Sequence, residues 1–92
     1  MSSRYFVSEN THPKVVRAIV LQTFEASPTQ SQKLYASGPH PSYVAAKTVA
    51  YVQERLPVRC AISWETVVDT GDSRECSYLV FTLEPAHGAE TL

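Results

Sequence analysis

The residues that come closest to a catalytic motif are Asp69, Thr70 and Gly71, which follow two valines in the stretch VVDTG. An Asp-Thr-Gly triplet after two apolar residues is typical of aspartic proteases, whose chemistry needs two carboxylates that share one proton. This chain supplies one such triplet, so a protease acting through Asp69 would have to be a dimer. Few residues follow Gly71, and the stretch also suits a tight turn, so we interpret it as a hairpin turn and keep the dimeric protease as an alternative.

The cysteines and histidines do not form a motif of their own. Cys60 and Cys76 are sixteen residues apart, without a Cys-x-x-Cys pair, and His12, His40 and His87 stand on separate segments. Metal sites need ligands that the chain brings together, and phosphate-binding loops need clustered glycines, whereas the three glycines here are scattered. We therefore expect no catalytic residue, no metal and no cofactor, and a protein that is not an enzyme.

The charge of the chain is divided unevenly. Residues 1–59 carry seven Lys and Arg and three acids, whereas residues 60–92 carry one Arg and six acids. Such a division favours an oriented encounter with a charged partner, unless the two halves interleave in space and cancel. The sequence has no apolar run near the roughly 18 residues needed to span a membrane. The start MSSRYFVSEN lacks the features of a signal peptide, so we expect a cytoplasmic protein without membrane contact.

The clearest element is a β-hairpin in the C-terminal third. Apolar residues occupy every second position from Val58 to Trp64 and again from Leu79 to Leu83, which is the period of half-buried strands. Gly71 can adopt the backbone angles that a hairpin turn requires. A turn centred on Gly71 and Asp72 predicts three facing pairs: Ile62 with Phe81, Trp64 with Leu79, and Cys60 with Leu83.

Residues 38–57 are predicted to form a helix, with Pro41 near its first turn and Pro57 at its end. Ala45, Val49, Val52 and Leu56 recur at helical spacing, so one face of this helix should pack on the sheet.

The N-terminal third is ambiguous. RYFVSE and KVVRAIVLQTFE flank the turn-like NTHP, and a helix from Pro13 to Phe24 fits the apolar spacing almost as well as a strand. The many β-branched residues favour a strand, which gives a second hairpin, and KLYAS adds a short strand. We therefore predict an α+β fold of order ββ(β)αββ, in which one helix covers one face of an antiparallel sheet of four or five strands. Residues 1–84 form a single domain, and residues 85–92 form a flexible tail.

Two surfaces of this fold are candidates for binding. The free face of the sheet would show Ala61, Val67, Cys76, Tyr78 and Val80, which is more apolar than a solvated sheet needs. This indicates a protein-binding face or a homodimer through that face, although scattered apolar residues are also common on surfaces.

The second surface is the N-terminal hairpin, where Arg4 and Arg17 would lie near one another beside Tyr5 and Phe6, with Lys14 close by. Basic and aromatic side chains together suit nucleic acid, whereas a pI of about 6.3 is low for a dedicated nucleic-acid-binding domain.

The short sheet-plus-helix chain, without a catalytic motif and with divided charge, resembles the small phage-encoded inhibitors of the anti-CRISPR type. That resemblance implies a non-enzymatic inhibitor in the bacterial host cytoplasm, which docks on a host protein or ribonucleoprotein complex, such as a CRISPR surveillance complex, contacts RNA and blocks target DNA binding. The alternative is a small nucleic-acid-binding module that uses the basic N-terminal hairpin. Because interface energy concentrates in Arg and aromatic side chains, the predicted partner-binding residues are Arg4, Lys14, Arg17, Arg59 and Tyr78.

Overall fold

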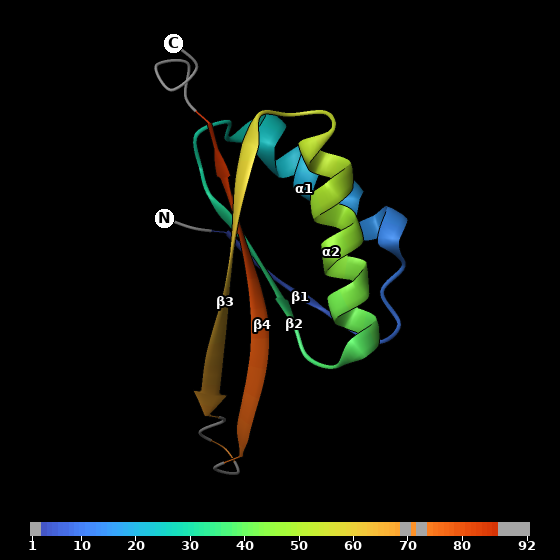
Figure 1. Ribbon diagram of the computed structural model, residues 1–92, viewed down its shortest axis with the longest axis vertical. Helices are drawn as coiled ribbons and strands as arrows, with labels where there is room; N and C mark the ends of the chain where they lie inside the picture. The colour runs from blue at the N-terminus through green and yellow to red at the C-terminus, as the bar shows by residue number, and fades with distance from the viewer. Residues whose placement is uncertain (1–2, 69–70, 72–73, 87–92) are drawn as a thin grey trace.

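The computed structural model describes residues 3–68, 71 and 74–86, which form one mixed sheet with two helices on one side of it (Figure 1). The strand order is β1-β2-β4-β3, with β1 parallel to β2 and the other two pairings antiparallel. The elements in chain order are β1 (Ser3–Val7), α1 (Pro13–Ala26), β2 (Gln32–Ala36), α2 (Pro39–Gln53), β3 (Val58–Val68) and β4 (Glu75–Pro85).

The predicted α+β class is confirmed, but the antiparallel sheet with a single helix is wrong in two respects. Residues 14–25 belong to helix α1, and the sheet is mixed. Val16, Val20 and Phe24 recur every four residues and are all buried, so burial of this stripe outweighs the weak strand preference of β-branched residues. The backbone N–H of Lys14 donates a hydrogen bond of 3.1 Å to Nδ1 of His12, which caps the helix start.

Helix α1 changes the direction in which the next strand runs. The predicted hairpin of two antiparallel strands around residues 10–13 is therefore absent, and β1 and β2 run parallel with the helix as their crossover connection. The short strand expected in KLYAS is β2. As a result Arg4 pairs across the sheet with Lys33, and Arg17 lies in the helical layer.

Helix α2 confirms the one predicted helix, although it ends at Gln53 rather than at Pro57, and its start depends on a glycine. Gly38 has φ of 92°, a left-handed conformation that side chains with a Cβ rarely adopt. The predicted stripe of Ala45, Val49 and Val52 is buried, and the buried face is wider than predicted because it also includes Val44.

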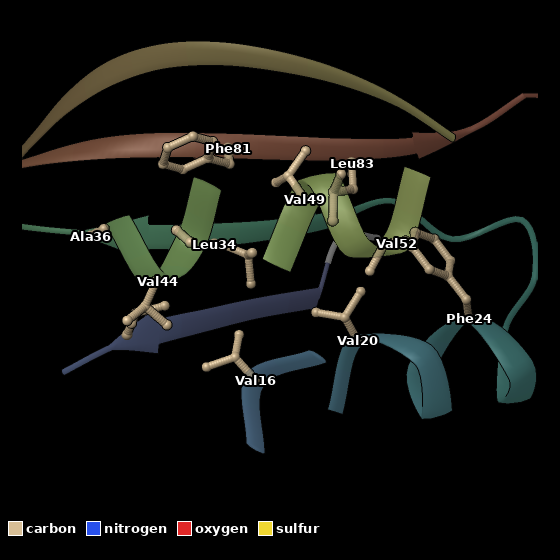
Figure 2. Packing of buried hydrophobic residues seen from close by; sticks show 12 residues of the cluster. Val16, Val20, Phe24, Leu34, Ala36, Val44, Val49, Val52, Phe81 and Leu83 are labelled. Carbon is tan, nitrogen blue, oxygen red and sulfur yellow. The ribbon is translucent and has the colours of Figure 1, made fainter. Parts of the chain in front are cut away.

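The register of the β3–β4 hairpin is as predicted. Ile62 faces Phe81, Trp64 faces Leu79 and Cys60 faces Leu83. Asp69 and most of the predicted turn lie outside the described residues. The helix-facing sides of β2 and β4 meet both helices in a single apolar core, as Figure 2 shows for Leu34, Phe81, Leu83, Val16, Val20, Phe24, Val44, Val49 and Val52.

The hairpin is longer than the helices that cover the sheet, so its far end projects beyond them (Figure 1). The molecule accordingly measures 48 × 24 × 21 Å. Ile62 and Trp64 lie on the helix side of the edge strand β3, facing Phe81 and Leu79, and stay 62% and 66% exposed. Strand β4 ends at Pro85, and residues 87–92 of the predicted tail lie outside the described part of the chain.

Candidate functional site

Because both helices lie on one side of the sheet, no described element covers the other side, which we call the open face (Figure 1). Side chains alternate between the two faces along each strand, so the strand register assigns the residues of the open face. They are Arg4 and Phe6 on β1, Lys33 and Tyr35 on β2, Arg59, Ala61, Ser63, Glu65 and Val67 on β3, and Cys76, Tyr78, Val80, Thr82 and Glu84 on β4.

Three aromatic rings from neighbouring strands gather on this face. Phe6 stacks on Tyr35 with 4.7 Å between ring centroids and 27° between ring planes. Tyr78 meets both rings edge-on, with its centroid 5.4 Å from that of Phe6 and 5.8 Å from that of Tyr35. Tyr35 is only 2% exposed, whereas Phe6 is 50% exposed, so Tyr35 forms the floor of the cluster and Phe6 presents its ring at the surface.

The floor of the aromatic cluster is fixed by hydrogen bonds. The hydroxyl of Tyr35 donates to Glu65, with 3.2 Å to each carboxylate oxygen, and Lys33 Nζ lies 3.8 Å from Oε2 of the same carboxylate. Burial, together with the hydrogen bond and negative charge of Glu65, raises the pKa of Tyr35 above its usual value near 10. At neutral pH Tyr35 is therefore a protonated donor that ties β2 to β3 across β4.

The charges of the open face are separated by the strand order. Arg4 and Lys33 are direct neighbours on β1 and β2, whereas Glu65 and Glu84 lie on β3 and β4. The N-terminal part of the chain supplies one half of the sheet and the C-terminal part supplies the other. The described charged residues of this face are therefore all basic on β1 and β2, whereas on the other two strands Arg59 lies opposite Glu84, and Glu65 reaches Lys33.

The structure unites two of the five predicted site residues. Arg4 and Tyr78 share the aromatic half of the open face, and Arg59 lies on the same face near the start of β3. Lys14 and Arg17 lie on α1 in the helical layer, so the expected surface that combined them with Arg4 is wrong.

Arg17 has a different environment from the one predicted. Its guanidinium carbon lies 4.3 Å from the ring centroid of Tyr51 on α2, and that of Arg55 lies 3.5 Å from the same centroid. Tyr51 is thus in contact with two guanidinium groups, and these cation–π contacts join the two helices at their surface.

Lys33, Tyr35 and Glu65 complete the site and were not predicted as site residues, whereas Phe6 was placed beside Arg4 in the predicted N-terminal hairpin without being predicted as a partner-binding residue. The sequence signal for Phe6 and Tyr35 is alternation within two short strands, RYFV and QKLYA. That signal places Phe6 beside Tyr35 only when β1 and β2 are known to run parallel, which depends on residues 13–26 being a helix.

The remaining reactive side chains lie apart from one another. Among the described residues, no three His, Cys, Asp or Glu side chains are grouped closely enough to hold a metal ion. Cys60 faces the core, where burial raises the pKa of its thiol, and Cys76 is on the open face, so the two predicted orientations are confirmed. No described helix is long and apolar enough to cross a membrane.

A groove of about 500 Å³ lies at the opposite end of the molecule from the hairpin turn, where the C-terminal ends of the helices meet the start of β3. Its walls are largely apolar, with Leu21, Phe24, Leu56, Pro57 and Pro85 among them. Binding sites for small polar substrates usually combine apolar walls with several convergent polar groups, and Glu25 is the one charged side chain among the described residues of this lining.

No protein-family model matches the chain, and no curated protein is significantly similar to it.

Proposed function

We propose that this chain is a non-enzymatic binding protein that holds single-stranded nucleic acid on the open face of its sheet. The observation that carries the proposal is the aromatic cluster of Phe6, Tyr35 and Tyr78 beside Arg4 and Lys33. Bases stack on exposed aromatic rings, and Arg and Lys neutralise the phosphates that connect the bases.

The arrangement of these residues suits one nucleotide step. Arg4 and Lys33 form one cross-strand row, and Phe6 and Tyr35 form the next row on the same face. Two residues along a strand span about 6.6 Å, so a base stacked on Phe6 would keep its own phosphate within reach of the basic row. Because the ring of Phe6 already stacks on Tyr35, the site is ordered before a ligand arrives.

The low pI of the chain is compatible with this proposal because the acids of the open face, Glu65 and Glu84, lie on β3 and β4 and not on the strands that carry Arg4 and Lys33. Glu84 lies at the far end of the β3–β4 pair, and Glu65 is held by Tyr35 and Lys33. Two basic side chains can neutralise only a few phosphates, so we expect modest affinity and a shallow dependence of binding on salt concentration.

The proposal is tested by fluorescence anisotropy with a labelled single-stranded oligonucleotide of about 12 nucleotides. Phe6→Ala should weaken binding roughly tenfold, because base stacking is worth about 1–3 kcal/mol. Arg4→Glu should weaken binding and flatten its dependence on salt.

A matched control lies in the helical layer. Tyr43 is an exposed aromatic residue of α2 whose ring has Lys47 Nζ 5.6 Å from its centroid, so it resembles the Phe6 site in chemistry but not in position. Tyr43→Ala should leave binding unchanged. A wild-type chain that does not bind the oligonucleotide, or equal losses in Phe6→Ala and Tyr43→Ala, would contradict the proposal.

The inhibitor function implied by the resemblance to phage proteins stays a prediction. The open face would serve equally for the RNA of a host ribonucleoprotein complex. Affinity capture from bacterial lysate with and without RNase tests it: a multi-subunit complex that survives RNase and Phe6→Ala would indicate that protein contacts hold the chain instead.

A further inference from the structure

Strand β3 forms one edge of the sheet along its whole length. It pairs with β4 from Val58 to Val68 in an unbroken register, and no other described strand pairs with it. Its sequence VRCAISWETVV contains no proline, and the continuous register shows no bulge. Natural proteins usually shorten or interrupt exposed edges, because an edge offers unpaired backbone groups to another strand.

One hydrogen bond shows which residues of β3 direct their backbone N–H and C=O groups away from β4. The N–H of Ala86 donates to the carbonyl oxygen of Pro57 at 2.7 Å, so the pair formed by residues 57 and 86 is of the hydrogen-bonded type. Such pairs alternate along an antiparallel ladder, so the odd-numbered residues of β3 bond to β4. The even-numbered residues, which include Cys60, Ile62, Trp64 and Thr66, therefore direct their N–H and C=O groups toward the free edge.

We propose that two copies of this chain pair through β3, antiparallel, with Ile62 on the two-fold axis. Ile62 then faces Ile62 of the second copy, and Trp64 faces Cys60 of the second copy. These residues all have outward backbone groups, so three facing pairs would exchange about six hydrogen bonds. The two sheets become one continuous sheet with all four helices on the same side of it.

Opposite charges on the two copies favour this register over those in which the two-fold axis is shifted by one residue in either direction. With Ile62 on the axis, Arg59 lies directly opposite Glu65 of the second copy, and symmetry makes this pairing twice. Both residues are in non-hydrogen-bonded pairs, where facing side chains come closest. Moving the axis to Ala61 or Ser63 still matches the outward backbone groups, but it places Arg59 opposite Ser63 or Val67.

Pairing also accounts for the exposed apolar side chains of the edge strand. Ile62 and Trp64 are 62% and 66% exposed in a single copy, although both lie on the helix side of the sheet. In the pair, Ile62 packs against its symmetry mate, and the indole of Trp64 lies over the side chain of Cys60 from the second copy. Both contacts remove apolar surface from water.

The dimer is tested by sedimentation equilibrium of the full chain. The wild type should be dimeric, and Ile62→Pro should be monomeric with an unchanged circular dichroism spectrum, since the N–H that proline lacks points away from β4. A wild type that stays monomeric up to about 1 mM would overturn the proposal. So would an Ile62→Pro variant that still dimerises, which is the result expected if the copies met through their open faces.

A charge-reversal cycle tests the register. Arg59→Glu and Glu65→Arg should each raise the dimer dissociation constant at least about tenfold, because each places two like-charged pairs opposite one another. The double variant Arg59→Glu/Glu65→Arg should restore most of the lost affinity, and Lys47→Glu on α2 is the control for net charge. A double variant as weak as the single variants would exclude this register.

This proposal does not depend on nucleic-acid binding. Phe6 and Arg4 lie on β1, at the other edge of the sheet, so the monomeric Ile62→Pro variant should still bind the oligonucleotide if the proposed function holds. Sedimentation equilibrium therefore tests the dimer, and oligonucleotide binding tests the proposed function, independently of each other.

Discussion

Tyr35 shows how a single residue can serve both stability and a binding surface. Its ring is buried under Phe6 and beside Tyr78, and its hydroxyl donates to the carboxylate of Glu65 on a strand two places away. A buried hydroxyl without an acceptor is costly, so the position of Glu65 is part of what allows a tyrosine here. The same hydrogen bond keeps the Glu65 carboxylate engaged beside Lys33.

We expect Tyr35→Phe to lower the free energy of unfolding by about 1 kcal/mol in urea denaturation at neutral pH, because the hydrogen bond to Glu65 is lost. The pH dependence should change as well. Because the pKa of Tyr35 is raised in the folded chain, the unfolded chain releases the proton first. The stabilisation is therefore complete below about pH 10 and is lost as the pH rises further.

The alkaline fall in stability should thus be steeper in the wild type than in Tyr35→Phe. Tyr43→Phe, which removes an exposed phenol from α2, is the control and should match the wild type. Identical alkaline slopes for the wild type and Tyr35→Phe would show that Tyr35 does not contribute to this fall.

At the scale of elements, local pattern was sufficient for the β3–β4 hairpin and for α2, but not for α1. The hairpin combines strict alternation with a short turn, so its register follows from neighbouring residues alone. In α1, valine and isoleucine suit a strand while their four-residue spacing suits a helix, and packing against α2 and the sheet decides between them. Tyr78 could be assigned to the free face from the hairpin, whereas Phe6 and Tyr35 could not, because their contact depends on α1.

The helical state of residues 13–26 predicts the effect of an exposed substitution. Val15 is half exposed on the outer surface of α1, so its β-branched side chain has a conformational cost in the helix and little burial to offset it. Val15→Ala should raise the free energy of unfolding by about 0.5 kcal/mol in urea denaturation. In a strand the same change would be destabilising, so a loss of stability would contradict the helix. Val16→Ala, at a fully buried position, should instead lower stability by about 2 kcal/mol.

Across the whole molecule, charge is distributed unevenly over the sheet, and the helices cover one side of the sheet but not the far end of the hairpin. The β1–β2 half of the sheet carries Arg4, Lys33, Phe6 and Tyr35 on the face opposite the helices, and the β3–β4 half is a longer hairpin with an open edge. This layout follows from the order of the strands in the sheet, so the amino-acid composition could not predict it. It assigns the two proposed contacts, with nucleic acid and with a second copy, to opposite edges of the sheet.

If two copies associate through β3, thermal stability should depend on protein concentration. The midpoint of unfolding, followed by circular dichroism, should rise with concentration for the wild type, because only the folded chain associates. The Ile62→Pro variant should show no such rise. A midpoint that is constant for both chains would contradict a folded-state dimer.

The strand order also has a consequence for how the protein is made. Strand β4 follows the other three strands in sequence, yet it lies between β2 and β3 and, among the described strands, it alone links the two halves of the sheet. During synthesis on the ribosome, β1, α1, β2 and α2 can begin to associate, but β2 has an open side and β3 has no partner until β4 has emerged. The nascent chain therefore leaves β2 and β3 incompletely paired until β4 has emerged, and a stop codon before β4 would remove the centre of the sheet rather than its margin.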